Sequence, residues 1–228
     1  MKILSVFLLT LTPLSATAHD MWLESTPAGY VLQLGHRNSD HGGEKILPYS
    51  TSAAKGALCF RDGSSTRLAA SGTAPYVVPG PCAAVVVEFS SGYWTETAYG
   101  ARNEPRSGWG DGRKSWLSVE QVKLLSEWRP GFTLPLEDGL ELSPQDDPIH
   151  AVPGDKVRFV LTLAGRPVAD AAVAFGGALR GRTGPDGSVN LRIRERGIQT
   201  VTASREEPLS DGKADTIIRA TTLQWETK

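Results

Sequence analysis

Three of the chain's four histidines lie close together in sequence, at His19, His36 and His41. Imidazole nitrogen is a ligand for nickel, copper, zinc and iron, so histidines that a fold gathers predict a site for a divalent transition metal. His36 and His41 fall in a turn-rich stretch after a predicted strand, and such a loop can bring them to His19. Oxygen ligands could come from neighbouring carboxylates: Asp20, Asp40 and Glu44.

Residues 1–18, which directly precede His19, have the pattern of a cleavable signal peptide. Lys2 precedes a mostly apolar run over 3–14, and small residues follow at Ala16 and Ala18. We expect cleavage after Ala18 and a periplasmic mature protein. The competing interpretation is an uncleaved membrane anchor, but the run is shorter than the ~20 residues that span a bilayer.

Cleavage after Ala18 would make His19 the first residue of the mature chain. Its α-amine and its imidazole then form a bidentate nitrogen chelate within one residue. The amine titrates near 8 and the imidazole near 6.5, so a metal can displace both protons at neutral pH. We predict nickel at this site, with cobalt, copper and zinc as alternatives.

Other interpretations of the same residue types stay open. Histidines in polar loops are often ordinary surface residues, and we expect His150 to be structural. The aromatic residues could form a surface that binds carbohydrate, or they could fill the edges of a small β core: Trp22, Tyr93, Trp94, Trp109, Trp116 and Trp128.

The overall composition argues against several classes of function. The charges balance, with 24 Lys and Arg against 25 Asp and Glu, and nucleic-acid binding depends on clustered Lys and Arg. We therefore expect no nucleic-acid partner. The chain also contains no G-x-S-x-G, Walker A, H-E-x-x-H or C-x-x-C motif, and we predict that it is not an enzyme.

The two cysteines, Cys59 and Cys82, are most simply a disulfide in an exported protein. A pair of free thiols or of thiolate ligands is the alternative.

The elements that must position these residues are mainly strands. The chain has 24 Gly and 15 Pro, and alternating or continuous apolar runs are separated by turn signals, which is typical of a β-sandwich. One short helix is expected from Ser118, where Gln121 stands at the capping-box spacing. The predicted strands cover 29–34, 83–89, 156–163, 168–175, 189–193, 199–203 and 216–221.

We predict an all-β protein with two sandwich-like domains. The stretch Ser143–Pro148 looks like a linker, and the sequence pattern changes after it, so we expect the boundary between the two domains there. The signal peptide would occupy 1–18, an N-terminal metal-binding domain 19–143 and a C-terminal domain 144–228.

Six short stretches of the chain, in this order, carry a likeness to a known family: His19–Glu24, Leu34–His36, Ser91–Thr97, Ser115–Glu120, Gly139–Pro144 and Asp215–Leu223. Together they resemble bacterial secreted proteins known as periplasmic components of nickel/cobalt uptake systems. The resemblance covers essentially the whole mature chain.

That resemblance implies a β-rich, two-part protein whose C-terminal module is Ig-like, of the carboxypeptidase-regulatory type. It implies that the protein binds nickel or cobalt and helps deliver the metal to a membrane transporter. The family's ligands carry over only to His19 and His36, whereas His41 comes from local spacing.

Two alternative functions remain. A terminal histidine with a second histidine is also the copper-binding arrangement of enzymes that cleave polysaccharides oxidatively, the histidine brace. A structural or adhesive β-sandwich without metal is the other alternative.

Overall fold

The computed structural model describes residues 20–37, 45–70, 72–110 and 112–228. Within these residues the chain is built of strands, with two short 3-10 turns, η1 (Arg106–Gly108) and η2 (Pro130–Thr133). The prediction of an all-β fold is confirmed. No helix of the described residues is long and apolar enough to cross a membrane.

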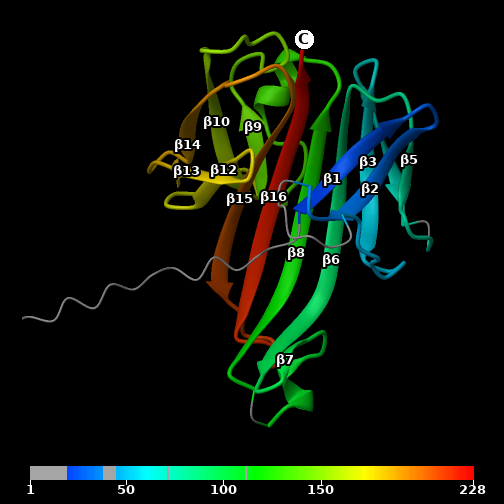
Figure 1. Ribbon diagram of the computed structural model, residues 1–228, viewed down its shortest axis with the longest axis vertical. Coiled ribbons are helices and arrows are strands. Elements are labelled where there is room, and N and C mark those ends of the chain that lie inside the picture. The colour runs from blue at the N-terminus through cyan, green and yellow to red at the C-terminus, as the bar shows by residue number, and fades with distance from the viewer. Residues whose placement is uncertain (1–19, 38–44, 71, 111) are drawn as a thin grey trace, which may run out of the picture.

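The strands form a large central sheet and two smaller sheets (Figure 1). The central sheet has the order β13-β12-β15-β16-β8-β6-β3-β4, with β7 beside β6. Its strands are β3 (Ala54–Arg61), β4 (Ser64–Ala69), β6 (Ala84–Thr97), β7 (Gly100–Arg102), β8 (Lys114–Leu125), β12 (Ala172–Phe175), β13 (Ala178–Arg182), β15 (Gly197–Pro208) and β16 (Thr216–Thr227).

The first smaller sheet, which we call the hairpin sheet, has the order β1-β2-β5. The second, which we call the outer sheet, contains β11, β10 and β14, with β9 paired to β10. Their strands are β1 (Asp20–Thr26), β2 (Gly29–Gly35), β5 (Val77–Pro79), β9 (Glu141–Pro144), β10 (Lys156–Leu163), β11 (Arg166–Pro167) and β14 (Ser188–Arg192).

The two smaller sheets cover opposite faces of the central sheet. Successive side chains of a strand point to opposite faces, and β8 shows this clearly. Val122 and Leu124 pack in a cluster with Leu23 and Leu32 of the hairpin sheet, whereas Leu125 packs in a second cluster with residues of the outer sheet. Strands buried on both faces read as continuous apolar runs, which explains the valines that begin β6.

The outer-sheet cluster is the larger of the two and is centred on aromatic rings. Trp225 of β16 is 1% exposed and lies against Phe159 and Phe175, with ring centroids 5.5 and 6.2 Å away. Phe159 comes from β10 and Phe175 from β12, so this cluster joins the outer sheet to the central one.

The prediction of a helix from Ser118 is wrong, because this segment lies in the middle of β8. Every residue of it pairs with a neighbour: Ser118 lies opposite Gly92 of β6 and Ile218 of β16. Pairing on both sides overrides a weak local capping signal. Gln121 donates to Glu141 instead of capping a helix.

The central sheet is continuous across the expected boundary between residues 143 and 144. That position falls inside β9, and β8 runs parallel to β16 from the Trp116–Thr216 pair to the Leu125–Trp225 pair. Residues 144–228 themselves contribute strands to both the outer and the central sheet.

Cys59 and Cys82 form a disulfide, with Cα atoms 5.4 Å apart, as predicted. The bond ties β3 of the central sheet to the link between β5 and β6. It therefore holds the edge of the hairpin sheet to the central sheet.

Candidate metal centre

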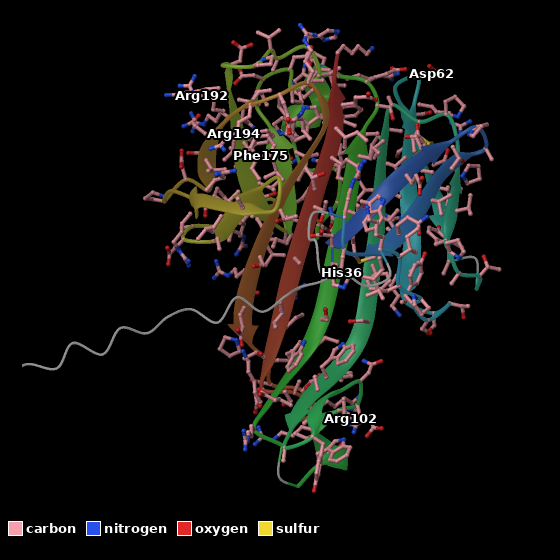
Figure 2. All side chains as sticks on the ribbon, viewed as in Figure 1. His36, Asp62, Arg102, Phe175, Arg192 and Arg194 are labelled. Carbon is pink, nitrogen blue, oxygen red and sulfur yellow. A yellow bond between two sulfur atoms is a disulfide. The ribbon has the colours of Figure 1, made fainter. Side chains whose placement is uncertain are left out.

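His36 is the first residue after β2 and is half-buried (Figure 2). Its backbone N–H donates to the carbonyl of Lys45 at 2.9 Å. Next to it, Gly35 forms an isolated bridge with Ile46, and Leu47 N–H donates to Leu34 at 2.7 Å. The end of β2 is thus held by the segment that begins at Lys45.

Gly35 is required by this close approach. A Cβ atom at position 35 would lie 1.9 Å from the Lys45 carbonyl oxygen, which no side chain tolerates. The glycine that precedes His36 therefore lets two backbone segments meet where the histidine begins, and this geometry fixes the position of the His36 backbone.

Asp20 lies at the same end of the hairpin sheet. It begins β1, and the antiparallel register places it opposite Gly35. Asp20 is half-buried. The strands therefore bring one carboxylate and one imidazole, Asp20 and His36, to one end of the hairpin although they are far apart in sequence.

Two of the three predicted ligands, His19 and His41, lie outside the described residues, as do Asp40 and Glu44. Their described neighbours are Asp20, Arg37 and Lys45. Among the described residues, no group of three or more His, Cys, Asp or Glu side chains could hold a metal ion. A metal site at this end of the hairpin would therefore need His19 or His41 in addition to His36.

Arg37 adds a positive charge beside this end. Its guanidinium lies 5.7 Å from the ring centroid of Trp22, a cation–π contact. Burial lowers the pKa of Arg37, while the nearby charges of Glu24 and Asp20 oppose the shift. Within the described residues, Nη1 of Arg37 is buried without a hydrogen-bond partner.

His150 has the structural environment expected for it. Its Nδ1 lies 2.7 Å from Asp147 Oδ2, and the amides of Ile149 and His150 donate to Asp147 Oδ1. Burial alone would raise the pKa of Asp147, but these hydrogen bonds lower it overall. The imidazole therefore closes a turn between β9 and β10.

The aromatic residues differ in where they lie and in how deeply they are buried. Trp22 is 8% exposed and Trp128 packs against the outer-sheet cluster. Trp94 and Trp116 face each other across β6 and β8, with centroids 6.3 Å apart and planes within 9°. That pair is half-buried and lies where the long strands extend beyond both smaller sheets (Figure 1).

A buried ionic network that we did not predict from the sequence lies under the outer sheet. Lys123 Nζ lies 2.6 Å from Glu141 Oε1, and both side chains are 0% exposed. Glu141 also accepts hydrogen bonds from Gln121 and from the amides of Leu136 and Glu137. The sequence does contain a signal for this network, because Lys123 interrupts an apolar run between Val122 and Leu124. A lysine that is fully buried nearly always has a charged partner.

A second carboxylate, Glu120, lies on the other face of β8, in register with Phe89. It is half-buried and forms no ion pair within the described residues. Burial raises the pKa of Glu120 to about 7, and a hydrogen bond with Ser118 opposes the shift.

Comparison with known proteins gives no relative: no family model, no curated protein and no solved structure significantly matches this chain.

Proposed function

We propose that this protein binds a divalent transition metal in the periplasm through a mature N-terminal His19, together with His36 and His41. Nickel is the metal we expect, with cobalt as the nearest alternative. The bound metal would be cargo that the protein passes to a membrane transporter, not a cofactor for a reaction.

The observation that carries this proposal is the register of the hairpin. Asp20 lies opposite Gly35, and paired Cα atoms in antiparallel strands are about 5 Å apart. Residue 19 is bonded to Asp20 and His36 to Gly35, and bonded residues have Cα atoms 3.8 Å apart. The Cα atoms of His19 and His36 are therefore at most about 13 Å apart, close enough for two histidine side chains to share one metal ion.

His41 fits the same site through its connections. The hydrogen bond from His36 to Lys45 joins the described residues on either side of 38–44, so the two ends of the segment that contains His41 are anchored beside His36. Asp20 would provide a carboxylate and partly offset the charge of Arg37, which otherwise disfavours a cation here.

The disulfide is compatible with the proposed compartment, because such bonds persist in oxidising surroundings such as the periplasm.

The test is calorimetric titration of Ni²⁺ into the mature protein and into two variants, His36→Ala and His150→Ala. Because even the loss of outer-shell contacts weakens metal binding 10–100-fold, we expect His36→Ala to lower the nickel affinity at least tenfold. His150→Ala, which removes an imidazole elsewhere, should leave it unchanged. Titration with Co²⁺, Cu²⁺ and Zn²⁺ ranks the metals.

Acid should weaken binding in the native protein, since nitrogen ligands must lose their protons before they bind metal. Equal nickel affinity for the native protein and His36→Ala would refute the proposal. Retained affinity at pH 5 would also contradict it.

A further inference from the structure

A hollow of about 310 Å³ lies where three parts of the chain meet. Arg37 reaches it from the end of β2, and Phe175, Gly176 and Arg180 reach it from the β12–β13 hairpin. Arg194 and Glu195 come from the turn between β14 and β15, and Ile198, Gln199 and Thr200 come from the start of β15. Its size is near the lower limit for small-molecule sites, which begin at about 300 Å³.

Three of the lining residues are arginines, Arg37, Arg180 and Arg194, against one carboxylate, Glu195. Many other arginines of the described chain have carboxylate partners, such as Arg158 with Asp186. Among the described residues, none of the three lining arginines forms an ion pair. The hollow therefore gathers more positive than negative charge, although the charges of Asp20 and Glu24 act on Arg37 from nearby.

Arg37 is the strongest indication that the hollow receives a ligand. One of its terminal nitrogens is buried and has no hydrogen-bond partner among the described residues. Leaving a buried donor unpaired costs about 1–3 kcal/mol. Arg37 also lines the hollow, so a small rotation of its guanidinium would let an oxygen ligand supply the missing acceptor.

The rest of the lining suits a carbon skeleton. Phe175 is buried in the outer-sheet cluster and borders the hollow, and Ile198, also on its wall, is 54% exposed. An exposed isoleucine between arginines offers apolar contact beside the charges. A bare inorganic ion would use none of this surface.

We propose that this hollow binds a small organic anion that carries two or three carboxylates. Guanidinium groups bind carboxylates through paired N–H···O hydrogen bonds. Arg180 of β13 and Arg194 of the turn after β14 would hold the carboxylates, and the guanidinium of Arg37 would complete the set. This site needs no metal, so it stands or falls separately from the nickel proposal.

The test is calorimetric titration of metal-free protein with tricarballylate, a tricarboxylate that chelates metals only weakly, and with phosphate. We expect saturable tricarballylate binding and weaker phosphate binding. Arg180→Gln and Arg194→Gln should each lower the tricarballylate affinity about tenfold, as expected for the loss of a charged hydrogen bond.

Arg102→Gln is the matched control. Arg102 is exposed on β7, at the opposite end of the molecule from Arg194 and Phe175 (Figure 2). The Arg102→Gln substitution removes the same charge, and we expect it to change the tricarballylate affinity less than twofold. Absence of saturable binding, phosphate binding as tight as tricarballylate binding, or equal losses in all three variants would overturn the proposal.

Discussion

The two faces of the central sheet hold charge in opposite ways. On the face toward the outer sheet, Lys123 and Glu141 are completely buried and paired. On the face toward the hairpin sheet, Glu120 has no cationic partner within the described residues, and Arg37 has a buried nitrogen without an acceptor. The buried Lys123–Glu141 pair stabilises the fold, whereas Arg37 keeps a donor that can still bind a ligand.

The two smaller sheets are also attached to the central sheet by different kinds of contact. The outer sheet is joined through the large aromatic cluster and the ionic network. The hairpin sheet relies on a smaller cluster, the disulfide and a few side-chain hydrogen bonds. We therefore expect the hairpin sheet, whose end carries Asp20 and His36, to separate from the central sheet more easily than the outer sheet does.

The largest effect should come from removing the buried carboxylate. Glu141→Ala leaves the charge of Lys123 buried and unpaired, which typically costs 3–5 kcal/mol, and it also removes the acceptor for two backbone amides. We expect the free energy of unfolding in urea to fall by about that amount. Lys114→Gln breaks an exposed ion pair with Glu206 and should cost less than about 1 kcal/mol. Similar losses from both variants would remove the contrast between buried and exposed charge.

A smaller loss is expected from Gln224→Ala, which detaches the hairpin sheet. Gln224 is buried; its Oε1 accepts from Leu23 N–H at 3.2 Å and its Nε2 donates to the Leu23 carbonyl at 3.0 Å. Since both backbone groups would lose their partner, we expect a loss of about 2 kcal/mol. Hydrogen exchange should show faster exchange in β1 but not in β10. Gln33→Ala, which removes an exposed hydrogen bond to Glu24, is the control. Unchanged exchange in β1 would mean that Gln224 does not hold this sheet.

A third effect is a pH dependence of stability that belongs to Glu120. Its pKa in the folded protein is raised from 4.5 to about 7, so the folded state keeps a proton that the unfolded state loses. This contribution to stability is complete below pH 4.5 and disappears as the pH rises through 7. We expect the native protein to lose stability relative to Glu120→Gln over this range, measured by urea unfolding at several pH values. Parallel pH profiles for the two proteins would show that Glu120 titrates normally.

Much of the fold could be predicted from the pattern of the sequence. Lys156–Leu163 alternates in hydrophobicity, and β10 has the bounds predicted for it. The prediction of a helix from Ser118 was wrong because the apolar spacing of this segment fits a helix as well as a strand. Only pairing with β6 and β16 decides between helix and strand.

The candidate sites could be predicted only in part. Histidines close in sequence pointed to the end of β2, but the pairing of Asp20 with Gly35 depends on the register of the hairpin. The three arginines of the hollow come from residues 37, 180 and 194, so no local pattern connects them. Lys123 and Glu141 meet only because β9 packs over the central sheet, in which β16 and β8 are neighbours.

In our proposal the free amine of His19 takes part in metal binding, and lengthening the chain by one residue isolates its contribution. Protein exported to the periplasm, with an N-terminus at His19 confirmed by mass, is titrated with Ni²⁺ beside the same protein carrying one alanine before His19. We expect at least tenfold weaker nickel binding for the extended protein, because the chelate of amine and imidazole is lost while every other side chain is kept. Equal nickel affinity of the two proteins would contradict it.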